Sequence, residues 1–94
     1  TANNWNVCQY AVLVHMMAQI SGFEPGELVH IIADAHIYDR HIPIVKEIIK
    51  QKQYKAPKFE IDKSVKDFYD FKVDSFKFVD YKCNTKKYKI EVAI

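Results

Sequence analysis

The chain has 94 residues, of which 49% are hydrophobic and 14% aromatic, and its formal net charge is +2. This composition is typical of one small globular unit and excludes a disordered polypeptide. All thirteen lysines lie at or after Lys46, but eight of the twelve acidic residues share that half, so the charges indicate a solvated surface and not a nucleic-acid patch.

The first predicted element is a helix that includes residues 7–20, preceded by asparagines that can cap it. Its sequence, VCQYAVLVHMMAQI, is apolar on almost every side. Helices of this kind lie inside larger proteins. A bilayer needs roughly 20 apolar residues, so a membrane span is not expected. Because 94 residues offer little to cover such a helix, we expect the chain to be a fragment.

The cysteines indicate a reducing environment. Cys8 and Cys83 are too few for a disulfide framework, and the start of the chain has no signal-peptide pattern. We therefore expect a cytoplasmic setting. Cys8 is expected to pack as a small hydrophobic residue, because free cysteines are usually buried.

Residues 28–38, LVHIIADAHIY, predict a β-strand with two different faces. Alternate side chains of a strand point in opposite directions. One face is wholly apolar, and the other carries Asp34, His36 and Tyr38. Buried polar groups need partners, so the polar row predicts a place that holds a ligand. A pair of satisfied core side chains explains the spacing of His36 and Tyr38 slightly better when the spacing is taken alone.

Shorter elements follow. An amphipathic helix is expected from residue 42 to about residue 52, with Pro43 in its first turn, where proline is tolerated. Alternating residues predict strands at 58–62 and 76–81, and one helical turn is expected within 64–70. The terminal Val-Ala-Ile is expected to dock into something apolar.

Metal and catalytic sites are not expected. His30, Asp34, His36 and His41 are close in sequence, but zinc needs three or four converging ligands. His30 would lie about 20 Å from His36 along a strand, and His41 should turn away as the next helix begins. No nucleophile with a neighbouring base and no glycine-rich phosphate loop is visible. The residues alone predict a ligand-holding segment of a larger α/β or α+β protein.

Three stretches taken together resemble the C-terminal part of thymidylate synthase. They are NNWNVCQYAVLVHMMAQ, DAHIYDRH and the terminal VAI, and FYDFKVDSFKFVDY is similar to the family's penultimate strand region. The resemblance implies an α+β fold: a long buried helix, a substrate-binding strand, an amphipathic helix and short strands that pack on a larger mixed sheet. Residues 1–94 would be the C-terminal portion of a single domain whose catalytic N-terminal portion is absent.

The resemblance also implies a function. The family converts deoxyuridylate (dUMP) to thymidylate (dTMP), with 5,10-methylenetetrahydrofolate as the donor of both carbon and hydride. Asn6 matches the asparagine that reads uracil, since its amide can donate to O4 and accept from N3–H. His36 and Tyr38 match the pair that holds the deoxyribose 3′-hydroxyl. Trp5 would lie against the folate, and Ala93 belongs to the tail that closes the site.

The family's catalytic centre has no match in this chain. Neither Cys8 nor Cys83 aligns with the nucleophilic cysteine of its Pro-Cys-His motif, and the phosphate-binding arginines are missing too. The tail also lacks the proline that commonly precedes Val-Ala-Ile. The resemblance implies a cytoplasmic, homodimeric methyltransferase that uses no metal and binds neither membranes nor specific nucleic acids. This segment alone would be inactive without the remainder of the enzyme.

Two alternatives stay open. A deoxycytidylate hydroxymethylase of the same superfamily would be expected to carry aspartate at the position of Asn6. A standalone, non-catalytic nucleotide- or protein-binding domain should fold as a soluble monomer with its 7–20 helix covered.

Overall fold

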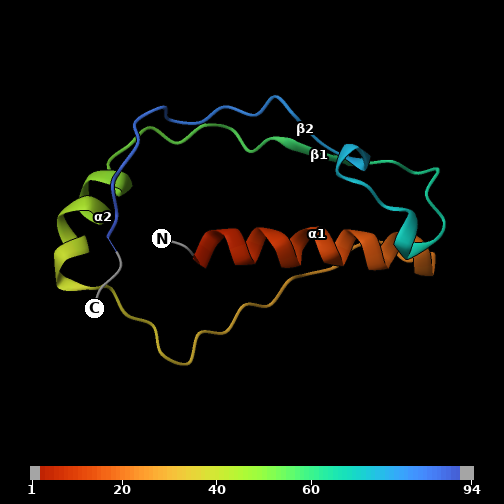
Figure 1. Cartoon of the computed structure of the whole chain (residues 1–94), viewed down its shortest axis with the longest axis horizontal. Coiled ribbons are helices and arrows are strands. Elements are labelled where there is room, and N and C mark those ends of the chain that lie inside the picture. The colour runs from red at the N-terminus through yellow and green to blue at the C-terminus, as the bar shows by residue number, and fades with distance from the viewer. Residues whose placement is uncertain (1–2, 92–94) are drawn as a thin grey trace.

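The structure is a computed structural model that describes residues 3–91. Helix α1 (Asn3–Ser21) lies across the middle of the view in Figure 1. The strands β1 and β2 lie on one side of it, and an extended segment, residues 23–38, lies on the other. Helix α2 (Ile42–Ile49) occupies the end of the molecule toward which the N-terminus of α1 points. None of the helices in residues 3–91 is long and apolar enough to cross a membrane.

Helix α1 ends at Ser21, and Gly22 turns the chain away from the helix axis. Gly22 has a φ of +74°, a conformation that costs glycine nothing because it has no Cβ. The Gly22 N–H donates to the carbonyl of Gln19 at 3.3 Å, and the Phe23 N–H donates to that of Ala18 at 2.9 Å. These two bonds form a Schellman motif, which satisfies carbonyls that the helix leaves open.

Much of α1 is exposed within this chain, above all in its first turns. Ala18 is the one apolar residue of the described chain that is buried, whereas the Trp5 side chain is 82% exposed. Cys8 is exposed as well, so the prediction that it packs as a small hydrophobic residue is wrong for this chain. The contacts that tie α1 to the rest of the described chain come from His15 and Gln19, in its C-terminal half.

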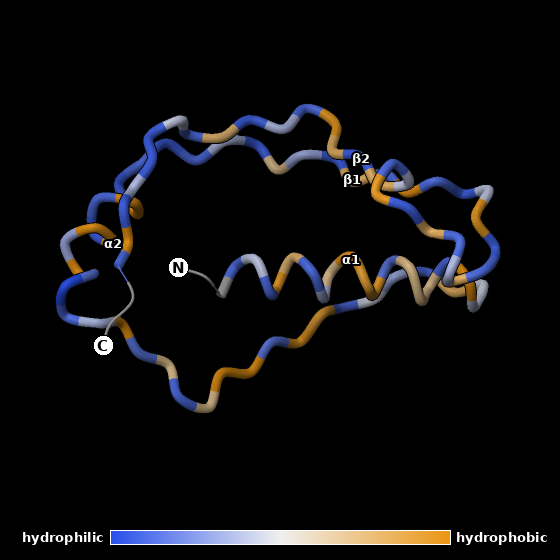
Figure 2. The backbone as a smooth tube through the Cα atoms, viewed as in Figure 1, coloured by the Kyte–Doolittle hydropathy of each residue, from blue (hydrophilic) through white to orange (hydrophobic). Residues whose placement is uncertain are grey.

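The strand predicted at residues 28–38 is not formed. This part of the extended segment makes no strand pairing among the described residues, although its backbone is drawn out and interrupted only by a bend. A strand requires a neighbouring strand that shares its backbone hydrogen bonds, and residues 3–91 place none beside this segment. Figure 2 shows hydrophobic stretches along this exposed segment, where Ile31 is 85% exposed.

Helix α2 follows a single 3-10 turn, η1 (Asp39–His41). Pro43 lies in its first turn, as predicted. The helix ends a little earlier than expected, because the N–H of Lys50 and of Gln51 close the last turn on the carbonyls of Glu47 and Ile48 at 3.2 and 3.1 Å.

The two short predicted strands are confirmed. β1 (Lys58–Ile61) and β2 (Phe76–Val79) pair antiparallel, with Phe59 opposite Phe78. The predicted helical turn is η2 (Phe68–Asp70), and a further 3-10 turn, η3 (Val73–Ser75), leads into β2.

An aromatic cluster joins this small sheet to α1. It consists of His15, Phe59, Phe71 and Phe76, with ring centroids 4.8 Å apart for His15 and Phe59 and 5.6 Å apart for Phe71 and Phe76. Gln19 adds two hydrogen bonds between α1 and the loop after β1, since its Nε2 donates to the carbonyls of Asp62 at 2.8 Å and Val65 at 2.9 Å. The chain therefore stabilises this part with its own contacts.

Candidate functional site

The structure brings His36 and Tyr38 together at the end of the extended segment, with ring centroids 5.4 Å apart. Nδ1 of His36 lies 3.1 Å from the backbone oxygen of Asp34 and 3.5 Å from its carboxylate. Because a carbonyl can only accept, Nδ1 carries the proton in this contact. The other ring nitrogen, Nε2, is then an acceptor in the neutral imidazole. Asp34 thus orients the ring, a role that the sequence left undefined.

His41 extends this pair to a row of three rings. Its ring centroid lies 5.3 Å from that of Tyr38 in an edge-on arrangement, and the backbone N–H of His41 donates to the Tyr38 carbonyl at 2.8 Å. The chain leaves the extended direction at η1, as expected, but His41 stays beside Tyr38. Residues three apart eclipse each other in a 3-10 helix, so η1 returns His41 to Tyr38. The spacing of three residues was the available signal.

Asn6 and Trp5 lie in the first turns of α1, and both are exposed. No hydrogen bond between described residues links Asn6 to His36 or Tyr38. The N-terminal end of α1 nevertheless points toward the end of the molecule that holds α2 (Figure 1). Ala93 lies outside the described residues.

The C-terminal segment, residues 84–91, runs beside α2 (Figure 1). Asn84 donates to the carbonyl of Lys52 at 3.2 Å, and Gln51 donates to the Tyr88 hydroxyl at 3.1 Å. The ammonium of Lys86 pairs with the carboxylate of Glu47, and this hydrogen bond raises the pKa of Lys86. In the fourth contact, Nε2 of the His41 ring lies 2.8 Å from the backbone oxygen of Glu91.

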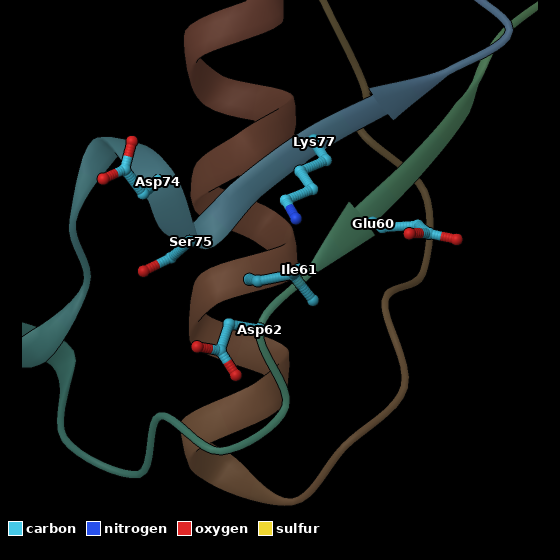
Figure 3. Close-up of a pocket in the computed structure, with 6 residues that line it drawn as sticks. All are labelled: Glu60, Ile61, Asp62, Asp74, Ser75 and Lys77. Atoms are coloured by element: carbon cyan, nitrogen blue, oxygen red, sulfur yellow. The ribbon is translucent and has the colours of Figure 1, made fainter.

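A separate hollow of about 280 Å³ opens at the end of the sheet away from α2 (Figure 3). Its lining is mostly polar: Glu60, Ile61, Asp62, Asp74, Ser75 and Lys77. Hydrogen bonds from the hydroxyl and backbone N–H of Ser64 lower the pKa of Asp62. No group of three potential metal ligands occurs in residues 3–91, and the hollow contains none of the predicted site residues.

Comparison with known proteins decides the family. A protein-family model described as thymidylate synthase matches residues 1–94. The thymidylate synthase of Bacillus licheniformis is 48% identical over 92 residues, and that of Bacillus phage phi3T is 46% identical over the same length; each alignment covers 98% of this chain. The solved structure of thermostable thymidylate synthase A from Bacillus subtilis superimposes with a TM-score of 0.90 at 46% identity, again over 98% of the chain.

The chain belongs to the thymidylate synthase family. The predicted resemblance and the α+β fold of the C-terminal segment are thereby confirmed. The chain covers 33% of the length of these bacterial relatives and 33% of the solved chain. A thymidylate synthase such as these therefore contains about three times as much polypeptide.

Proposed function

We propose that this chain acts as the C-terminal third of a thymidylate synthase, which converts dUMP to dTMP with 5,10-methylenetetrahydrofolate as donor of carbon and hydride. The observation that carries the proposal is the oriented His36–Tyr38 pair in a chain that matches the family over its full length. In this reading residues 1–94 are part of one domain, and the remainder of the enzyme supplies the catalytic nucleophile and the phosphate-binding arginines.

His36 and Tyr38 are proposed to hold the deoxyribose 3′-hydroxyl of dUMP. With Nδ1 engaged by Asp34, the Nε2 lone pair of His36 can accept the hydroxyl proton. The phenol of Tyr38 can donate to the same hydroxyl oxygen. A sugar hydroxyl can thus use both its donor and its acceptor capacity, which fixes the orientation of the nucleotide.

Asn6 is proposed to read the base. Its amide nitrogen can donate to O4 of uracil while its oxygen accepts from N3–H. Cytosine presents the reverse pattern at these positions, so the same amide would leave polar groups of cytosine unpaired, which is costly in a closed site.

Trp5 and Ala93 are proposed to contact the folate. The Trp5 ring is almost fully exposed on α1 and offers a flat apolar surface to an aromatic cosubstrate. Closure of a tail that includes Ala93 would exclude water from the reacting groups. The intact enzyme is proposed to be a cytoplasmic homodimer that needs no metal, and this segment alone is proposed to be inactive.

The test uses a full-length enzyme in which this chain follows the upstream two thirds of the B. subtilis thymidylate synthase. We expect dTMP formation from dUMP and methylenetetrahydrofolate, and none from the 94-residue chain alone. Tyr38→Phe should raise the KM for dUMP about tenfold, because one hydroxyl hydrogen bond is lost. A folded full-length enzyme without activity on dUMP would contradict the proposal. Activity on deoxycytidylate instead of dUMP would favour the hydroxymethylase alternative.

A further inference from the structure

Tyr38 stands between two imidazoles that the chain holds very differently. Its ring centroid lies 5.4 Å from that of His36 and 5.3 Å from that of His41. The side chain of His36 is 56% exposed, and that of its partner Asp34 is 91% exposed. His41, in contrast, is only 9% exposed. His41 is therefore the neighbour of Tyr38 that packing restrains.

A contact from far along the chain fixes the His41 ring. Its Nε2 atom lies 2.8 Å from the backbone oxygen of Glu91, fifty residues later. A carbonyl can only accept, so Nε2 donates. The backbone N–H of His41 also donates to the Tyr38 carbonyl, which closes η1. Both the ring and the backbone of His41 are thus held, and the ring cannot turn without breaking a hydrogen bond.

The arrangement of the two rings restrains Tyr38 in turn. The ring planes of Tyr38 and His41 meet at 72°, an edge-on geometry that contributes more than the area it buries. Tyr38 is 45% exposed, so solvent on its open side leaves room for its ring to change rotamer. A fixed neighbour on the other side reduces this freedom before a ligand arrives, which lowers the cost of binding.

We propose that His41 is a positioning residue for Tyr38: its ring, held by the Glu91 carbonyl, keeps the phenol in the orientation that can donate to the sugar hydroxyl of the nucleotide. This inference rests on the proposed function, because it takes Tyr38 as a partner of the 3′-hydroxyl. When only part of the protein has the binding conformation, the apparent Kd rises in inverse proportion to that part. Loss of the His41 ring should therefore weaken the hold on the 3′-hydroxyl alone.

The test separates the ring of His41 from its contact with Glu91. In the full-length enzyme, His41→Gln keeps an N–H donor near the position of Nε2 and removes the ring beside Tyr38. We expect the Kd for dUMP to rise about fivefold, the effect of losing one edge-on aromatic pair. The Kd for 2′,3′-dideoxyuridylate, which lacks the 3′-hydroxyl, should change by less than about twofold. Lys86→Ala is the control, because it removes another contact of the C-terminal segment and leaves both rings in place.

An unchanged Kd for dUMP in His41→Gln would overturn the inference. An equal rise for dUMP and the dideoxy analogue would overturn it too, because His41 would then support the whole site and not the 3′-hydroxyl contact. If His41→Gln does not fold, the same two Kd values are measured for His41→Leu, a second variant without the ring. A Kd for dUMP that rises in Tyr38→Phe but in neither His41 variant would refute this inference alone. Failure of the unsubstituted enzyme to bind dUMP would instead refute the proposed function, and the inference with it.

Discussion

The aromatic cluster and the extended segment contain similar residues but differ in what holds them. Around the cluster, rings from α1, β1 and β2 touch one another, and Gln19 ties the helix to the loop after β1. The extended segment carries Val29, Ile31 and Ile37, yet all three are more than half exposed. Apolar surface of this size is normally covered in a folded protein. The comparison shows that the described residues stabilise the first region with their own contacts and leave the apolar side chains of the second exposed.

The less covered region is also the one that carries the residues proposed to bind the nucleotide. His36 and Tyr38 stand at the end of the extended segment, and Asn6 lies on the uncovered end of α1. A site assembled from such pieces needs a rigid support to hold its geometry. Covering these elements with the upstream part of the enzyme would provide that support.

The largest effect should come from removing the upstream part altogether. We expect amide exchange in residues 28–38 to be faster by at least about 10³-fold in the isolated chain than in the full-length enzyme, because exchange then needs no unfolding. Residues of β1 and β2 should keep more protection than the extended segment. A sharp, cooperative thermal transition of a monomeric 94-residue chain would contradict this difference and would favour a standalone binding domain.

A substitution among the apolar side chains of the extended segment should show whether the full-length enzyme buries them. In the full-length enzyme, Ile31→Ala should lower the free energy of unfolding by about 3 kcal/mol, the usual cost of truncating a buried isoleucine. Val73→Ala is the matched control, because Val73 is 88% exposed and Ile31 85% exposed in this chain. The control should change stability by less than about 0.5 kcal/mol in urea unfolding. Equal effects of the two substitutions would show that the extended segment stays uncovered.

Asn6→Asp tests whether the uncovered end of α1 reads the base. The ratio of kcat/KM for dUMP to that for deoxycytidylate should fall about 100-fold, because a carboxylate accepts from the cytosine amino group and cannot donate to O4 of uracil. Asn4→Asp, the same change two residues earlier on the same helix, should leave the ratio unchanged. An unaltered ratio in Asn6→Asp would remove the role assigned to Asn6.

The smallest effect is expected at the surface of α2. Lys86→Met removes the ion pair with Glu47 and should shift the Tm of the full-length enzyme by no more than about 1 °C. The pKa of Lys86 is raised in the folded state, so any stabilisation is fully present below its ordinary value of 10.5 and is lost as the pH rises above the raised value. A Tm shift of several degrees at neutral pH would mean that residues 84–91 are held mainly by this pair.

Much of the local structure could be predicted because it depends on neighbours in sequence. Gly22 ends α1 because its backbone adopts a positive φ. Proline is tolerated at Pro43 because backbone N–H groups in the first turn of a helix have no partner within the helix. The strands around Phe59 and Phe76 follow from alternation. The spacing of His36 and Tyr38 likewise fixes that the two rings are near each other.

The predictions that were wrong concern features that depend on contact with another part of a protein. The alternation in residues 28–38 is that of a strand, but the backbone bonds of a strand exist only when another strand lies beside it. Cys8 has a helix position suited to a core, yet no described residue covers it. Periodicity reports what a segment can bury, and it does not report whether the burying surface is present.

The sequence by itself determined the family, the presence of both helices and the closeness of His36 and Tyr38, the pair proposed to hold the sugar. Only the tertiary structure decided that η1 returns His41 to Tyr38 and that Glu91, fifty residues later in the chain, meets the same imidazole. The physical reason is range. Propensity, capping and alternation act over a few residues, whereas a hydrogen bond between η1 and the C-terminal segment depends on how the whole intervening chain folds back.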